Sequence, residues 1–344
     1  MLFTTVGNGL LSKILMQNKE IIRNISKRLL TSIFVVFIIV SLIFVLIRLA
    51  PGDPSYKFVS PSLSSKHIDI VKQKFQLDEP IHIQYFYFIK NIFEGDLGIS
   101  YDYRRPAFEV IFEALSFTVR FSILVFIFQL IISFILAFIS IKLAGGTIDK
   151  LITKVSLLVY SLPVFVAGLI LILLFSIVLD WLPLSGYYSI SSNDKSILLN
   201  IWDNFKHLIL PVITLSLSFI PVYFRYIRDN FESLSSSAFI LNLKANGISE
   251  KIILVKHIIP NSLNPLIAIA GIDIGLLLSG SLITEYIFGL PGMGRLTLEA
   301  IFSRDYPIII GCSILSSLFM VFANIGMDLF RTLLDKRNSE VIIS

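Results

Sequence analysis

The residue types that carry out chemistry in enzymes are sparse in this chain and do not cluster. The four histidines, His67, His82, His207 and His257, lie in expected loops or at the edges of apolar runs, without the HExxH spacing of a zinc site. The one cysteine, Cys312, lies inside an apolar run, so no internal disulfide or CxxC metal site can form. The GxxxxGK[ST] motif, which holds the phosphates of ATP, is missing. We therefore expect no catalytic residue, no metal site and no cofactor.

Asp273 is the one ionisable residue inside a long apolar run. Charge is costly within a membrane, so a carboxylate there usually faces a cavity, a substrate pathway or a partner group. A protonated or hydrogen-bonded carboxyl group can instead serve only in packing. The sequence leaves both interpretations of Asp273 open.

The elements that must position these residues are long and apolar. Of the 344 residues, 55% are hydrophobic and 15% are charged, against about 45–50% and about 25% in a soluble domain. This composition excludes a soluble enzyme and indicates a polytopic membrane protein. The 29 Lys and Arg are spread between the apolar runs, which argues against nucleic-acid binding. Six runs are long enough to cross a bilayer as helices: Leu29–Ile47, Phe121–Ile141, Val155–Leu179, Leu208–Phe224, Ser262–Thr284 and Pro307–Met327.

Lys and Arg near the ends of short loops predict the orientation of these helices. The N-terminal segment and the loop Lys142–Lys154 are the most basic, so both are expected in the cytoplasm, as are both termini. The first run is too long for a cleaved signal sequence and is expected to stay as a helix. The predicted organisation is a cytoplasmic segment 1–28, a first helix 29–48, an extracytoplasmic segment 49–120, a five-helix core 121–331 with a cytoplasmic loop 230–261, and a cytoplasmic tail 332–344.

The cytoplasmic loop has the pattern of a helical hairpin. A serine cluster that begins at Ser235 offers an N-cap, and Phe239–Ala245 has helical spacing. Gly247 then supplies a stop, and Ser249 starts a second helix with Glu250 in its first turn. By its physical character alone, this hairpin could dock in a partner's groove or lie on the membrane surface.

This loop resembles the coupling loop of permease subunits from binding-protein-dependent ABC importers. The family pattern is Glu-Ala-Ala, three residues, Gly, nine residues and an Ile-x-Leu-Pro-like ending. Here the spacing from glycine to proline is retained, but the Glu-Ala-Ala position holds other residues. The resemblance implies that the following residues contact an ATPase subunit: Leu241, Asn242, Leu243, Ala245, Gly247, His257 and Pro260.

Further segments resemble the B-type permease of the oligopeptide, dipeptide and nickel branch of that family. They are RLAPGDP at Arg48–Pro54, LDEPIHIQYFYFIKNIFEGDLGIS at Leu77–Ser100, TEYIFGLPGMGRL at Thr284–Leu296 and SRDYP at Ser303–Pro307. The motifs occur in family order over nearly the whole chain. At Leu333–Asn338 the chain departs from the family, which usually has a proline after the aspartate.

The EYIFGLPGMG segment has two interpretations. The resemblance implies an outer gate formed by Glu285, Phe288, Pro291 and Gly292. The alternative is an interfacial re-entrant turn in which Arg295 is merely paired with an acid.

The resemblance implies a transport subunit without its own ATPase, located in a bacterial-type inner membrane. It would form half of a translocation pathway for peptides, with nickel or a metal chelate as the alternative cargo. Its partners would be a second homologous permease, one or two ABC ATPase subunits, an extracytoplasmic binding protein and the lipid bilayer. An ion-coupled carrier or channel and a membrane scaffold are the other functions considered, and a carrier usually concentrates ionisable residues at the membrane midplane.

Overall fold

The computed structural model describes residues 30–46, 49, 79–188 and 197–334. All regular elements in these residues are helices, as the sequence predicts, and one isolated bridge joins Ile99 and Pro106. The predicted segment 1–28, the PGDP residues and positions 335–344 lie outside the described residues.

After the first apolar helix, Leu30–Leu46, the elements are α3 (Ile81–Phe93), α4 (Ala107–Lys142), α5 (Thr147–Ser161), α6 (Val164–Leu171), the π-helix η2 (Ile172–Val178), α7 (Ile197–Ser216), α8 (Ile220–Ser235), α9 (Ala238–Ala245), α10 (Glu250–Ile252), the π-helix η4 (Ile253–Ile258), α11 (Ile259–Leu278), α12 (Leu282–Ile287), α13 (Met293–Ser303) and α14 (Tyr306–Leu334).

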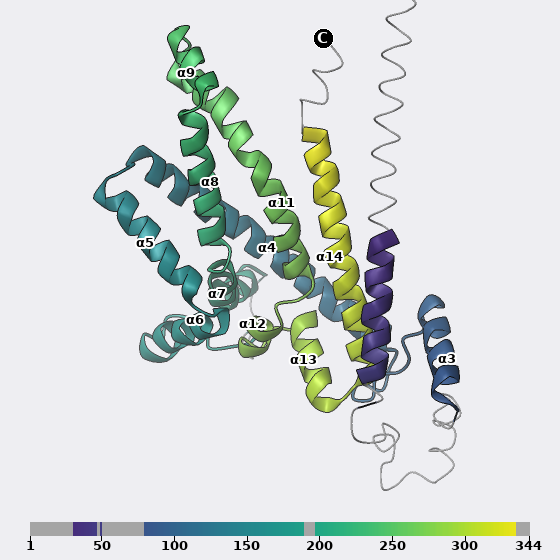
Figure 1. Cartoon of the computed structure of the whole chain (residues 1–344). Coiled ribbons are helices and arrows are strands. Elements are labelled where there is room, and N and C mark those ends of the chain that lie inside the picture. Colours follow the sequence, from purple (N-terminus) through teal and green to yellow (C-terminus); the bar gives the residue numbers. More distant parts are fainter. Residues whose placement is uncertain (1–29, 47–48, 50–78, 189–196, 335–344) are drawn as a thin grey trace, which may run out of the picture.

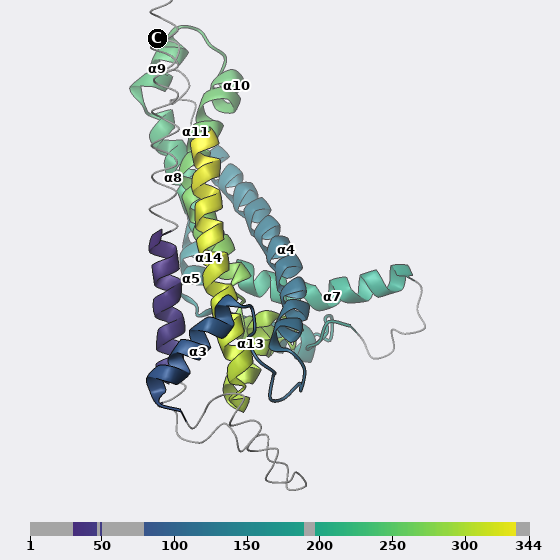
Figure 2. The same ribbon diagram turned by 90° about the vertical axis from the view of Figure 1, so that its right-hand side faces the viewer.

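The helices form an elongated bundle with two distinct ends (Figures 1 and 2). The end with α9 and α10 is called the hairpin end, and the end with α3 and α13 is called the opposite end. The central helix, α4, packs against α7, α8, α11, α13 and α14. Its 36 residues rise by about 54 Å, which exceeds the ~30 Å hydrocarbon core of a bilayer. The helix therefore begins well before the predicted apolar run, directly after Pro106.

The third predicted span is not one straight helix. α5 and the α6–η2 segment meet at an angle of 106° across a short break. Leu162 is extended (φ −84°, ψ 129°), and Pro163 precedes the first residue of α6. A residue before proline avoids the helical region, and proline has no N–H to continue the helix, so the sequence Leu-Pro explains the bend.

The fourth predicted span is bent as well. α7 and α8 meet at 53°, and Pro221 lies in the first turn of α8. Among the described residues, three helices are long and apolar enough to cross a membrane, or up to five if each bent pair counts as one span. The first predicted span is present as the shorter apolar helix Leu30–Leu46. The bundle is thus a polytopic all-α protein, whereas the exact number of six spans is not confirmed.

Helices α11 and α14 pack closely because α11 presents two glycines one turn apart. A Cβ placed on Gly271 would lie 3.0 Å from Cβ of Met327. A Cβ placed on Gly275 would overlap the Met320 sulfur and would lie 3.2 Å from the Met320 Cα. Small residues at this spacing let two membrane helices approach until their backbones are nearly in contact.

We expect Gly275→Val to destabilise the bundle, because a larger side chain must push the α14 backbone away. Overpacking of this kind costs about 1–3 kcal/mol. The matched control is Gly326→Val in α14, where no atom lies within 4 Å of an added Cβ. Thermal unfolding of the purified protein in detergent measures the difference. Equal midpoints for the two variants would contradict the close packing of α11 against α14.

Candidate functional site: the helical hairpin and the buried carboxylates

The predicted helical hairpin is present at the hairpin end. Ser237 caps α9, since its Oγ accepts a hydrogen bond from the Ile240 N–H at 3.4 Å. After α9 ends, Gly247 adopts a left-handed conformation with φ +76°. The N–H of Gly247 donates to Lys244 O at 3.0 Å, and the N–H of Ile248 donates to Leu243 O at 3.2 Å. This pair of bonds is a Schellman motif, which favours glycine at the left-handed position.

A small apolar core holds the two arms of the hairpin together. Ile240, Ile253 and Ile258 are buried in it, and Leu243 and Ile248 pack against them. Leu243 and Ile248 occupy the two positions whose hydrophobic contact commonly accompanies a Schellman motif, and both pack on the same core. One side of the hairpin is therefore occupied by its own packing.

The hairpin also carries four exposed apolar side chains. Phe239 is 55% exposed and Leu241 is 56% exposed, and Ile252 and Val255 on the second arm are exposed as well. The His257 ring lies edge-on to the Phe239 ring, with centroids 5.6 Å apart. The four exposed apolar residues are called the hairpin surface. An apolar surface of this kind suits contact with another protein better than contact with water.

The residues predicted to contact an ATPase differ in their exposure. Leu241 belongs to the hairpin surface, whereas Leu243 packs on the hairpin core. Asn242 accepts a hydrogen bond from the Asn246 side chain at 3.1 Å and is exposed. Ala245, Gly247 and Pro260 are also exposed, Pro260 at the first turn of α11. The structure brings all seven predicted residues to one end of the bundle, and their contact with an ATPase stays a prediction.

Asp273 lies inside the bundle and joins three helices. Its Oδ2 accepts hydrogen bonds from the Gln129 amide of α4 and from the Tyr223 hydroxyl of α8, the latter at 2.8 Å. All three side chains are fully buried. These contacts lie within one chain and favour the packing interpretation of Asp273, while a role in lining a pathway stays a prediction.

Glu285 is buried at a helix terminus. Its Oε2 accepts hydrogen bonds from the backbone N–H groups of Gly294 and Arg295 in the first turn of α13, at 2.8 and 3.1 Å. The Thr118 hydroxyl of α4 donates to Oε1 at 3.2 Å. A carboxylate is favourable there, because the first N–H groups of a helix have no partner within the helix. A Cβ on Gly292 would overlap the Glu285 carboxylate, so glycine at this position makes room for it.

The turn around Glu285 combines buried and exposed residues. Phe288 is buried, whereas Pro291 is exposed. Arg295 is paired with an acid, and its partner is Glu299 at 2.6 Å. The role of Glu285, Phe288, Pro291 and Gly292 as a gate stays a prediction.

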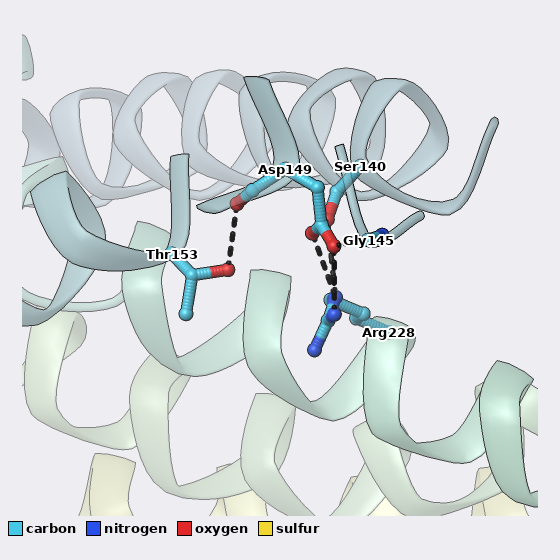
Figure 3. A network of polar contacts seen from close by, with 5 residues as sticks. All are labelled: Ser140, Gly145, Asp149, Thr153 and Arg228. Carbon is cyan, nitrogen blue, oxygen red and sulfur yellow. Dashed lines mark hydrogen bonds and ion pairs between the residues drawn. The ribbon is translucent and has the colours of Figure 1, made fainter. Parts of the chain in front are cut away.

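Two further buried carboxylates were not singled out from the sequence. Asp149 of α5 accepts hydrogen bonds from the Ser140 hydroxyl and from the Gly145 N–H, and it forms a two-point ion pair with Arg228 of α8 (Figure 3). At the opposite end, Asp305 accepts from the Ser100 hydroxyl at 2.5 Å and from the Asp102 N–H at 3.2 Å.

The sequence carries a partial signal for these residues. Asp149 is the one acid in the basic loop Lys142–Lys154, and an acid that interrupts a basic loop suggests a local partner. Gln129 is the one amide in the apolar run Phe121–Ile141, where a polar side chain indicates a contact between helices. Ser100 and Asp305 lie in two of the family motifs, but no spacing rule joins positions so far apart in the chain. The described residues contain no group of three His, Cys, Asp or Glu side chains arranged to hold a metal ion.

Comparison with known proteins gives matches over most of the chain. Residues 129–340 match the family "Binding-protein-dependent transport system inner membrane component", and residues 21–124 match the N-terminal model of such membrane components. The probable peptide ABC transporter permease protein y4tP of Sinorhizobium fredii is 33% identical over 91% of this chain and 98% of its own length. The glutathione transport system permease protein GsiC of Escherichia coli is 31% identical over 88% of this chain and 94% of its own length.

One solved structure, of the MetNI methionine ABC transporter in inward-facing conformations, is 12% identical with a TM-score of 0.43. The match covers 68% of this chain and 95% of the chain in the solved structure. This likeness is too weak to support a conclusion. The two sequence matches, each over more than four fifths of the chain, and the family models decide the assignment. The chain belongs to the binding-protein-dependent transport system inner membrane components, and it is the permease subunit of an ABC importer.

Proposed function

We propose that this permease imports peptides and works with a second homologous permease, ATPase subunits and an extracytoplasmic binding protein. The observation that carries the peptide assignment is the match to y4tP, a probable peptide permease, over 91% of the chain. GsiC is named for glutathione, which is itself a tripeptide. Both relatives favour peptides over the nickel or metal-chelate alternative.

Uptake by the reconstituted complex tests the substrate. We expect radiolabelled peptides to accumulate in proteoliposomes only when ATP and the co-purified binding protein are both supplied. Accumulation of radioactive nickel but not of peptides would support the alternative cargo. Peptide uptake that needs no ATP would indicate a carrier or channel, and ATPase docking without any uptake would indicate a scaffold.

We place the hairpin end in the cytoplasm and the opposite end outside. The turn between α4 and α5 lies toward the hairpin end (Figure 1), and this turn belongs to the basic loop Lys142–Lys154. Basic residues in short loops favour the cytoplasmic side of a membrane. The same orientation puts α3 and the Glu285 turn on the side from which a binding protein would deliver its cargo.

Cysteine labelling in intact cells tests this orientation. Single cysteines are introduced as Glu94→Cys and Ser236→Cys in a Cys312→Ala background, because Cys312 is the one native cysteine and is buried. Both new sites are exposed in the structure. We expect an impermeant maleimide to label position 94 and to reach position 236 only after the cells are opened. The reverse pattern would invert the topology.

The hairpin surface suits a rigid contact with an ATPase subunit. Its apolar side chains project from a hairpin whose arms are fixed by a buried core and by the Schellman turn. A rigid hairpin can transmit a movement of the ATPase subunit to α8, the helix that leads into the hairpin. A flexible loop would absorb that movement. Gly247 is central to this rigidity, because a residue with a Cβ is strained at φ +76°.

We expect Gly247→Val to reduce the amount of peptide transported per ATP hydrolysed by roughly fivefold or more. A fivefold change is about the smallest effect that is typical of coupling between two sites. The matched control is Gly95→Val, because Gly95 has φ +78° and, like Gly247, has no atom within 4 Å of an added Cβ. Both variants therefore carry a similar backbone strain, but only one alters the hairpin. Transport, complex assembly and ATPase activity are measured in proteoliposomes. Similar results for the two glycine variants would remove the coupling role.

A further inference from the structure

The Asp149 and Arg228 side chains form a network of polar contacts with Ser140 and Gly145 at the turn between α4 and α5 (Figure 3). Arg228 Nη2 lies 3.0 Å from Asp149 Oδ2, and Arg228 Nε donates to Asp149 Oδ1 at 3.1 Å. Ser140 and Gly145 donate to the same two carboxylate oxygens. The Asp149 side chain is 4% exposed and that of Arg228 is 26% exposed. A two-point pair between a guanidinium and a carboxylate fixes orientation as well as distance.

This network joins α8, the helix that leads into the hairpin, to the turn between α4 and α5. Ser140 lies in the last turn of α4, Asp149 lies in the first turn of α5, and Arg228 lies on α8. α8 continues to Ser235 and leads through a two-residue link into α9, the first arm of the hairpin. Any displacement of the hairpin therefore acts on α8 close to the point where Arg228 attaches it to α5.

From α5, packed contacts continue toward the turn that contains Glu285. α5 leads through the break at Pro163 into α6, and α6 packs against α7 and α12. A Cβ on Gly168 of α6 would lie 3.0 Å from the Thr214 methyl group and 3.5 Å from the Phe288 ring. α6 thus touches both α7 and the Glu285 turn with almost no intervening space. A rigid joint between α8 and α5 would connect the hairpin to this region.

We propose that Asp149 and Arg228 are positioning residues that lock α8 to the α4–α5 turn, so that α8, α5 and the hairpin move as one unit during transport. The proposal rests on the proposed coupling role of the hairpin. Ser140 and Gly145 belong to the same lock, since they hold the carboxylate in the orientation that Arg228 meets.

The adjacent turn of α8 offers a matched control. Arg225 and Asp229 form an ion pair at 3.4 Å, with side chains that are 75% and 56% exposed. This pair links two residues of α8 and does not join α8 to another helix. Exposed pairs contribute little because water screens them, so its removal should leave the helix in place.

The first experiment measures peptide transport per ATP hydrolysed in the reconstituted complex. We expect Asp149→Ala and Arg228→Ala each to lower this ratio by roughly fivefold or more. The double variant should be no worse than the poorer single variant, because all three break the same contact. Arg225→Ala and Asp229→Ala should keep the wild-type ratio. Wild-type ratios in both lock variants, or losses that multiply in the double variant, would overturn the proposal.

A purely structural role makes a different prediction. Loss of stability would lower the amount of assembled complex and would reduce transport and ATPase activity in proportion, leaving their ratio unchanged. Arg228→Lys adds a graded variant, because lysine keeps the charge but cannot make the two-point contact. We expect its transport per ATP to fall between those of wild type and Arg228→Ala. A ratio equal to that of wild type would show that the charge alone is sufficient and would overturn the orienting role of the guanidinium.

The second experiment measures the distance between α5 and α8 directly, first with the lock intact and then with it weakened. Spin labels are attached through Lys150→Cys on α5 and Asp229→Cys on α8 in the Cys312→Ala background, both at exposed positions. We expect the same distance between the labels in nucleotide-free and ATP-trapped complexes, and a broader distribution when Arg228→Lys is added. A distance that changes with nucleotide while the lock is intact would overturn the proposal.

The two hypotheses fail in different ways. If Gly247→Val uncouples transport but Arg228→Ala does not, the lock fails and the coupling role of the hairpin stands. If Gly247→Val has no effect, the coupling role fails, and the label distance still decides whether α8 and α5 move together.

Discussion

The structure depends on one recurrent interaction: a backbone N–H at a place where the chain changes direction finds a carboxylate of the same chain as its hydrogen-bond partner. A backbone N–H without a partner is costly when it is removed from water. In this chain three buried carboxylates meet that need. Asp149 accepts from Gly145 after α4, Glu285 accepts from the first turn of α13, and Asp305 accepts from Asp102 in the loop before α4. Each carboxylate lies where the chain changes direction.

These carboxylates hold the breaks between helices in defined positions. The α12–α13 turn is tied to α4 through Thr118, which donates to Glu285 and accepts from the Met293 N–H at 2.8 Å. The loop between α3 and α4 is tied to the start of α14 through Ser100. The breaks are therefore defined joints between rigid helices. Such joints would let the helices of a transport subunit move as rigid bodies while the hydrogen bonds at their ends are kept.

Asp273 follows a different rule. It accepts only from side chains, and these come from α4 and α8, so it connects the middle of the bundle and does not cap a backbone. α8 is consequently attached at two levels, through Tyr223 to Asp273 and through Arg228 to Asp149. Both attachments lie on the helix that carries the hairpin. The position of the hairpin relative to the bundle is thus set by polar contacts, which are directional, as well as by apolar packing, which is not.

The sequence by itself determined the class of the protein and the local form of the hairpin. Long charge-free runs leave helices as the stable structure in a membrane, and the serine cap and Gly247 act within a few residues of each other. Interactions between residues that are close along the chain can be recognised from the sequence alone. The Leu-Pro bend after Ser161 was also present in the sequence, but hydropathy does not report direction, so the run Val155–Leu179 was predicted as one span.

Only the tertiary structure decided which polar residues meet. From the sequence alone, Asp149 could have faced water among the neighbouring lysines, and the hydrogen-bond partners of Asp273 could not be named. Their partners Arg228, Gln129 and Tyr223 lie on other helices, and spacing along the chain says nothing about such pairs. The choice depends on how α4, α5, α8 and α11 rotate and cross when they pack. That geometry arises from the fit of many side chains at once, including Gly271 and Gly275 against α14, and no single segment contains it.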